Sequence, residues 1–275
     1  YELANPEYVS NDLLRACGYF EYPELDKNGK PTGKMKAMSA SEEQSEKLKF
    51  LIFARQNDNV QGTATYCPAN REQLVRFFNN YNYTIYVPTN DQVAAARAKG
   101  LMTWDEINEW VATRTNDFED DLSSADSIKA RTMITVLVNF VKYHFQDQSV
   151  FVDNVTAENQ YQTSCIDNVT NSYLSLTVTQ SPSALSVLDR SGNKVDVVAS
   201  EENRNLLARD ICYNAAAASA SYVKNSSYVV IHQIDGYLNY NSPEDYKGLR
   251  FSGWSQRRVH IGTEGWSLHK VRRSD

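Results

Sequence analysis

The spacing of hydrophobic residues predicts helices in the middle of the chain and strands in its second half. In several segments between residues 71 and 145, apolar side chains recur every three or four positions, as on one face of an amphipathic helix. Thr103 and Glu106 form a capping-box pattern, and Thr89 with Asn90 can cap the helix before it. The predicted helices are Asn11–Ala16, Arg71–Asn79, Asn90–Lys99, Trp104–Ala112, Ser127–Phe145 and Glu201–Ile211.

Short apolar or alternating runs bounded by turn residues predict strands before and after these helices. Asp189–Asn193 has the composition of a hairpin turn. The polar stretch from Asp26 to Glu46 is predicted as a long surface loop, with a turn at Asp26–Gly29. The predicted strands are Leu48–Arg55, Gly62–Cys67, Tyr83–Pro88, Ser149–Val152, Tyr173–Thr179, Leu185–Leu188, Val195–Ala199 and Tyr228–Tyr237. Helices followed by strands indicate an α+β fold.

Composition places the chain among ordinary globular proteins. Its 275 residues are 41% hydrophobic and 23% charged, which argues against disorder. The formal net charge of -6 gives no general attraction to nucleic acid or acidic membranes. The four cysteines are scattered and fit neither a zinc site nor a C-x-x-C motif. We therefore expect them to act as small buried hydrophobic residues. The longest apolar run, Met133–Val141, is far shorter than the roughly 20 residues of a membrane-spanning helix.

The motifs in this sequence select no reaction, cofactor or metal. The chain lacks the G-x-S-x-G, P-loop and G-x-G-x-x-G patterns. His144 and His232 belong to no metal-ligand pair, and we interpret them as packing residues. The acidic run from Asp117 to Asp126 lacks the order of a calcium loop and is predicted to cap and solvate the next helix. We therefore expect neither metal nor cofactor, while distant paired carboxylates of a glycan-processing enzyme stay an alternative.

The C-terminal residues 241–275 differ from the rest because they carry more basic than acidic side chains. Two tryptophans alternate with these cations, and an indole face can stack on a sugar or a cation. The candidate binding surface is Trp254, Arg257, Arg258 and Trp266. The alternative is that this tail wraps the body of the protein and buries its tryptophans.

Three segments of the chain carry a resemblance to a known family. They are Tyr83–Asp91 (YTIYVPTND), Phe140–His144 (FVKYH) and Tyr228–Leu238 (YVVIHQIDGYL). In this order they resemble the first signature, the tyrosine–histidine motif and the second signature of the fasciclin domain family. Asp210 and Ile211 stand where many members carry an Asp-Ile pair. The resemblance covers roughly residues 71–240.

The resemblance implies an α+β fold, namely a wedge-shaped β-sandwich with helices packed along one edge. We interpret the matching residues as mainly structural, although the Tyr-His and Asp-Ile regions are implicated in integrin adhesion in animal members. The matching residues are Thr89, Asn90, Asp91, Tyr143, His144, Asp210, Ile211, His232 and Asp235. We expect one domain over residues 1–240, with insertions at about 25–70 and 213–226 and an extension at 241–275. Any function particular to this protein is expected in these additions, because loops tolerate variation.

These observations lead to a hypothesis of a non-enzymatic adhesion or binding module that recognises protein or glycan at a cell surface. The chain begins at Tyr1 without a basic and apolar leader, so we expect a mature or trimmed chain whose leader or lipid anchor preceded it. We expect export to a bacterial cell envelope, on the outer surface or in the periplasm. The alternatives are a carboxylate-dependent glycan-processing enzyme and a purely structural spacer domain.

Overall fold

The computed structural model describes residues 8–17, 21–37, 82–114, 124–167, 170–207, 229–241, 259–262 and 265–268, with Leu3 and Pro6. The chain divides into two compact units. The first unit comprises Tyr1–Phe53, Asn57–Leu74 and Met102–Val138, and the second comprises Ala54–Gln56, Val75–Leu101 and Asn139–Asp275.

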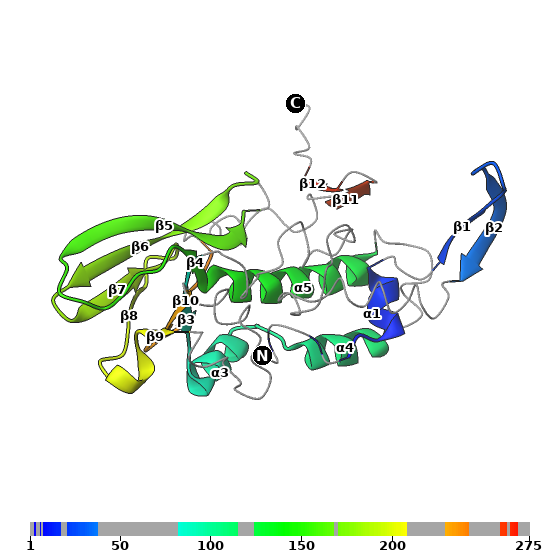
Figure 1. Ribbon diagram of the computed structural model, residues 1–275. Coiled ribbons are helices and arrows are strands. Elements are labelled where there is room, and N and C mark those ends of the chain that lie inside the picture. Colours follow the sequence, from blue (N-terminus) through cyan, green and yellow to red (C-terminus); the bar gives the residue numbers. More distant parts are fainter. Residues whose placement is uncertain are drawn as a thin grey trace, which may run out of the picture. The chain divides into compact units, whose positions relative to one another are not determined.

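The first unit contains packed helices. It holds α1 (Asn11–Ala16), α4 (Trp104–Ala112) and most of α5 (Ala125–Tyr143), shown in Figure 1. Ser10 caps α1 by accepting a hydrogen bond from Leu13 N at 3.0 Å, and its own N–H donates to Asn108 Oδ1 of α4 at 3.1 Å. The helices bury a set of large apolar side chains: Leu13, Leu14, Trp104, Ile107, Val111, Ile134 and Leu137.

A hairpin in the first unit corrects the prediction of a long loop. Strands β1 (Glu21–Leu25) and β2 (Pro31–Ala37) pair antiparallel; β2 lies inside the stretch predicted as a surface loop, and β1, just before that stretch, was not predicted. The turn itself is confirmed, because Asp26 Oδ1 accepts hydrogen bonds from Asn28 N at 2.8 Å and Lys30 N at 2.9 Å. The error has a physical reason: cross-strand pairing can stabilise strands whose side chains are mostly polar.

The second unit is built on a mixed sheet. In the described part of the chain this sheet has eight strands in the order β8-β7-β6-β5-β4-β3-β10-β9. Strands β3 and β10 pair parallel, and the other neighbours pair antiparallel. The strands are β3 (Tyr83–Val87), β4 (Phe145–Asp147), β5 (Ala157–Ile166), β6 (Tyr173–Ser181), β7 (Ala184–Leu188), β8 (Lys194–Asp196), β9 (Leu206–Leu207) and β10 (Val229–Gln233).

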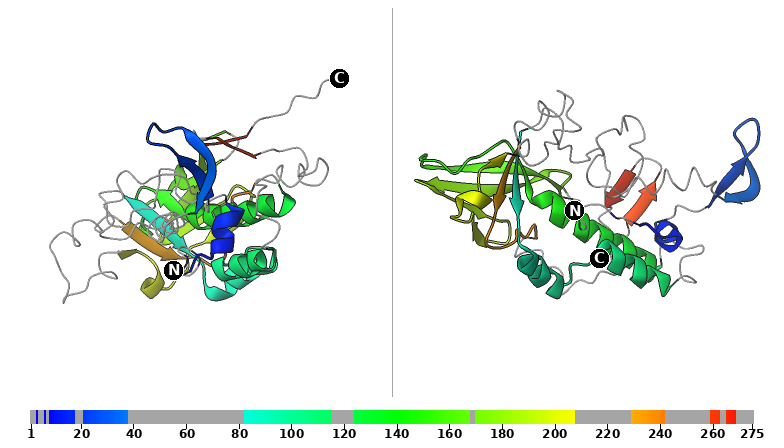
Figure 2. Two further views of the ribbon diagram at one scale, coloured as in Figure 1. Left: turned by 90° about the vertical axis from the view of Figure 1, so that its right-hand side faces the viewer. Right: turned by 60° about the horizontal axis from the view of Figure 1, so that its bottom comes forward.

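The sheet is strongly curled (Figures 1 and 2). A bridge between Val197 and Ile234 joins the chain after β8 to the chain after β10. Next to this bridge, Asp196 N donates to Asp235 Oδ1 at 2.8 Å and Asp235 N donates to Asp196 O at 3.0 Å. The helices and this curled sheet confirm the α+β class.

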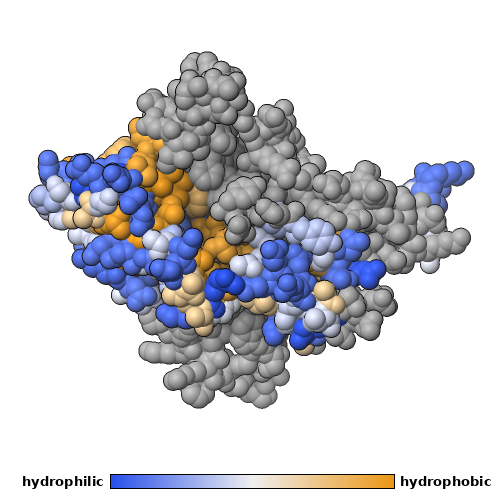
Figure 3. Space-filling view, turned by 90° about the horizontal axis from the view of Figure 1, so that it is seen from below, coloured by the Kyte–Doolittle hydropathy of each residue, from blue (hydrophilic) through white to orange (hydrophobic). Residues whose placement is uncertain are grey.

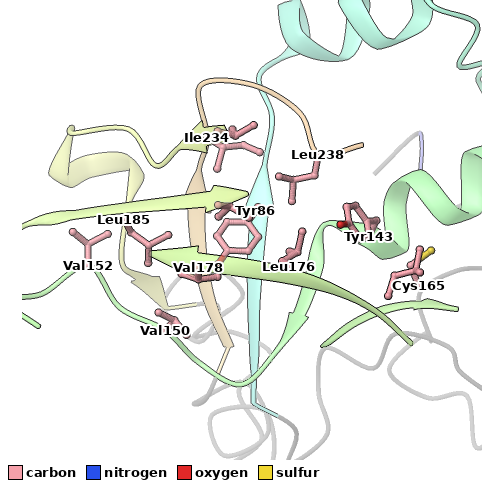
Figure 4. Close-up of a cluster of buried hydrophobic side chains, with 13 residues drawn as sticks. Tyr86, Tyr143, Val150, Val152, Cys165, Leu176, Val178, Leu185, Ile234 and Leu238 are labelled. Carbon is pink, nitrogen blue, oxygen red and sulfur yellow. The ribbon is translucent and has the colours of Figure 1, made fainter. Parts of the chain in front are cut away.

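The curled sheet encloses one hydrophobic core. Figure 4 shows side chains from β3, β6, β7 and the segment after β10 converging there, with Tyr143 from the end of α5. Tyr86, Leu176 and Val178 are about 1% exposed, and Val187 and Ile234 are fully buried. Alternation along β6 explains this burial, because every second residue of a strand points to the same face. The core therefore gathers strands that are far apart in sequence.

Four predicted helices are confirmed, and one predicted helix is wrong. Helices α1 and α4 have the predicted bounds, and α3 (Asn90–Ala98) and α5 begin and end within two residues of the prediction. The prediction of a helix over Glu201–Ile211 fails over its described part. That part forms the short 3-10 helix η2 (Glu201–Asn203) and strand β9, and β9 pairs with β10.

Some strand predictions are wrong, because an apolar segment forms no strand and a polar segment does. Ser149–Val152 is not a strand; the chain pairs earlier, in β4, directly after α5. Strand β5 was missed because its first half is polar and mostly exposed on both faces. A further hairpin of β11 (Val259–Gly262) and β12 (Gly265–Leu268) was also not predicted. The predicted segments Leu48–Arg55, Gly62–Cys67 and Arg71–Asn79 lie outside the described residues.

Candidate functional site

The three segments that carry the family resemblance come together in the second unit. Strand β3, from the first segment, pairs along its whole length with β10, from the third, with Ile85 opposite Ile231. The second segment closes α5 and turns into β4, the other neighbour of β3. Tyr86 N donates to His144 O at 3.0 Å across this junction. Segments that are far apart in the sequence therefore form one hydrogen-bonded layer.

His144 connects the end of α5 to the chain after β10. Its Nδ1 lies 2.8 Å from Phe140 O, and its Nε2 accepts a hydrogen bond from Leu238 N at 3.0 Å. Because Nε2 accepts, the proton of the neutral ring is on Nδ1 and donates to Phe140 O. Burial lowers the pKa of the His144 imidazole from its ordinary 6.5 to about 4, although the bond to Phe140 O raises it. The ring is neutral at pH 7, with both nitrogens paired.

His232 is a second buried histidine with both nitrogens paired. Its Nδ1 accepts a hydrogen bond from Asn205 N at 3.0 Å, and its Nε2 donates to Val150 O at 2.9 Å. Burial lowers the pKa of His232, the hydrogen bond to Val150 O raises it, and Arg204 lowers it further. The ring stacks near Tyr86, with the ring centroids 6.2 Å apart. His232 therefore links β10 through hydrogen bonds to the chain at Asn205 and at Val150.

Tyr143, the neighbour of His144, joins α5 to the strands of the sheet. Its hydroxyl donates to Ser175 O of β6 at 3.0 Å and accepts from Arg190 N at 3.0 Å. Burial raises the pKa of this phenol, so the hydroxyl keeps its proton. Tyr143 is fully buried and His144 is 4% exposed, so neither side chain offers a polar group to a partner in this structure.

The residues at the start of α3 act at the entrance of the helix. Thr89 is the N-cap residue, and its N–H donates to Gln92 Oε1 at 2.6 Å. Asn90 and Asp91 follow in the first turn and are exposed. The carboxylate of Asp91 is favourable there because the N-terminus of a helix carries partial positive charge. Asp235 acts differently, as the acceptor that closes the curled sheet on Asp196 N.

The other predicted site residues lie mostly outside the described part of the chain. Trp266 lies in β12, where it is opposite Ile261 of β11 in the register. Those outside the described residues are Asp210, Ile211, Trp254, Arg257 and Arg258. The structure therefore brings together the motif residues of the sheet, and the predicted tail surface stays a prediction.

Two polar residues that the sequence did not single out hold this region together. Asp189 is 5% exposed; its Oδ1 accepts from Ser191 and Asn193, and its Oδ2 accepts from Asn239 N at 2.9 Å. Asn205 adopts a positive φ of 54° and clamps Val152 through both its side-chain atoms. An asparagine in a turn is a weak signal for such a clamp, because asparagine is common in turns generally.

The described residues also include a partly hydrophobic face and two buried cysteines. Figure 3 shows one face where a hydrophobic area lies among hydrophilic residues. Cys17 and Cys165 are buried as expected, and burial raises the pKa of each thiol to about 12. Within the described ranges, no three His, Cys, Asp or Glu side chains are placed to hold a metal ion. No helix in the part of the chain that the structure describes has the length and hydrophobicity to cross a membrane.

A scan against family models and a search of curated proteins both find no match to this chain.

Proposed function

We propose that the protein is a fasciclin-like adhesion or binding module that is exported to a bacterial cell envelope and recognises a protein or glycan. In this proposal the curled sheet belongs to a wedge-shaped β-sandwich with helices along one edge. Recognition occurs by surface complementarity and needs no covalent chemistry.

The observation that carries the proposal is the convergence of the three resembling segments. The residues of these segments carry the resemblance, and the segments are neighbours in one hydrogen-bonded layer. His144 and His232, one from the second segment and one from the third, are buried and fully paired. Residues that fix a scaffold are expected in a family signature, because a binding scaffold must hold its variable loops rigidly.

Because the signature residues Tyr143 and His144 are buried and hydrogen-bonded, we expect a ligand to bind elsewhere on the protein. Tyr143 and His144 present no free polar atom, so an adhesion contact through them would need the sheet to open. The candidate binding surface therefore stays with the tail residues Trp254, Arg257, Arg258 and Trp266. Indole faces and guanidinium groups are frequent centres of binding energy at interfaces.

A binding screen tests this proposal. The full chain is applied to glycan and matrix-protein arrays beside a variant carrying Trp254→Ala and Trp266→Ala. We expect at least one ligand class to bind the native chain and the variant to bind it about tenfold or more weakly, as for a central aromatic residue. Tyr173→Ala is the matched control, since it removes a 37% exposed aromatic ring from β6 and should leave binding unchanged.

Each other outcome of the screen is informative. Binding that survives the tryptophan substitutions places recognition outside the tail. No binding by any version contradicts the adhesion proposal and favours the spacer alternative. Release of sugar from an arrayed glycan contradicts the non-enzymatic part of the proposal and favours the glycan-processing alternative.

A further inference from the structure

A short irregular segment after β10 is held to the domain by polar contacts from three directions. Leu238 is fully buried, and its N–H donates to His144 Nε2 at 3.0 Å. The next amide, Asn239 N, donates to Asp189 Oδ2 at 2.9 Å, and Arg190 Nη1 lies 3.4 Å from Tyr240 O. Residues 237–241, which we call the latch segment, form no regular strand or helix. Their position therefore depends on these side-chain contacts.

The contact at Leu238 requires a neutral imidazole. His144 can accept this hydrogen bond only through the lone pair of Nε2, because Nδ1 already uses its proton on Phe140 O. A proton added at Nε2 would place an N–H against the Leu238 N–H and leave a positive charge in a buried site. Both effects oppose the closed position of the latch segment.

We propose that His144 makes the latch segment an acid-sensitive connection, which is closed at neutral pH and opens locally when the imidazole is protonated. The inference does not depend on the proposed binding function. Asn241 ends the latch segment, so opening it changes the point at which the chain leaves the sheet toward its C-terminal residues.

The charged groups around the latch segment do not offset a proton on His144. Lys99 of α3 lies over the Tyr237 ring at 5.4 Å, and Lys142 precedes the Tyr-His pair on α5. Arg190 pairs with Asp167 at 3.3 Å. The carboxylate of Asp189, which binds the latch segment at Asn239 N, already accepts hydrogen bonds from the turn as well. The rings of Tyr143 and Tyr240 form an edge-to-face pair, and burial raises the pKa of Tyr143 so that its phenol keeps its proton.

The sign of the effect follows from the two states of the histidine. Burial depresses the pKa to about 4 in the closed state, whereas a released imidazole has the ordinary pKa of 6.5. The closed state is thus favoured fully above pH 6.5, and this preference is lost as the pH falls from 6.5 to 4. Between pH 7.5 and pH 5 the open population is expected to rise about 30-fold.

Amide hydrogen exchange measured by NMR on the full chain tests the inference. The protection factor of Leu238 N–H, corrected for intrinsic exchange, is compared at pH 7.5 and pH 5 with that of Val178 in β6. We expect Leu238 to lose protection about 30-fold more than Val178 does. Equal losses at the two amides would mean opening of the whole unit, and an unchanged Leu238 would mean no switch; either result overturns the proposal.

Two variants separate His144 from other acid-sensitive groups. His144→Gln keeps an acceptor within reach of Leu238 N but cannot be protonated, so the extra pH dependence at Leu238 should disappear. His232→Gln is the matched control, because it removes a second buried histidine of the described residues and should leave the Leu238 effect in place. If His144→Gln does not fold, the native chain still decides the question through the Leu238 and Val178 comparison.

Discussion

At the scale of single residues, the sheet unit depends on polar side chains that bind backbone groups. His144, His232 and Asn205 each pair with main-chain atoms of segments distant in sequence. A buried polar group without a partner costs on the order of 1–3 kcal/mol, so such contacts specify which loops lie beside which strands. The sequence indicated that both histidines are packing residues, and the structure adds which backbone atoms each one holds.

Two substitutions of Asn205 can separate the contribution of its hydrogen bonds to stability from the cost of its positive φ. Asn205→Gly removes both bonds to Val152 but tolerates the positive φ, and we expect a loss of about 2 kcal/mol in the free energy of unfolding. Asn205→Ala loses the same bonds and also strains the backbone, adding about 1 kcal/mol. Urea denaturation of the two variants measures both numbers. An alanine variant as stable as the glycine variant would contradict the strain argument.

At the scale of secondary-structure elements, local signals decided the helices and tertiary pairing decided several strands. The capping box of α4 was visible in the sequence and is present: Thr103 N donates to Glu106 Oε2 at 2.8 Å, and Glu106 N donates to Thr103 Oγ1 at 3.3 Å. Strand β4 has only three residues and is held by neighbours on both sides. No local pattern marks such a strand, because its hydrogen bonds depend on segments elsewhere in the chain.

The capping box of α4 can be tested with two substitutions. Thr103→Ala removes the oxygen that accepts from Glu106 N, and we expect a loss of about 1 kcal/mol in the free energy of unfolding of the first unit. Thr103→Ser keeps that oxygen and should cost a few tenths of a kcal/mol at most. Chemical denaturation followed by tryptophan fluorescence reports the change. A serine variant as destabilised as the alanine variant would show that the loss of unfolding free energy comes from the missing methyl group and not from the cap.

At the scale of the whole molecule, the second unit is organised by the curl of its sheet around one core. Leu176 and Leu188 lie on adjacent strands, yet Leu176 is 1% exposed and Leu188 is 42% exposed. Alternation along β6 predicts that Leu174, Leu176 and Val178 share a face. Only the closed arrangement, completed by the Val197–Ile234 bridge, makes that face the interior.

A matched pair of leucine substitutions tests where this core lies. Leu176→Ala leaves a cavity inside the curled sheet, and we expect it to cost about 2–5 kcal/mol of unfolding free energy. Leu188→Ala removes the same atoms from an exposed position and should change stability by less than about 0.5 kcal/mol. Thermal unfolding of the two variants in parallel gives the comparison. Similar losses at both positions would contradict the assignment of the interior face.

The sequence alone determined the features that depend on neighbours in the chain. These are the α+β class, the start of α3 and α4 at their caps, the hairpin turn at Asp189–Asn193, the alternating strand β6 and the short apolar strand β7. Each depends on side-chain periodicity or on a cap within a few residues, so its cause is local.

Only the tertiary structure decided the rest, because hydrogen bonds between distant segments carry no local signature. The polar strand β5, the parallel pairing of β3 with β10 and the clamp at Asn205 are of this kind. The same holds for His144: its residue type and position at a helix end were readable, but its bond to Leu238 exists only once the sheet has brought the two together.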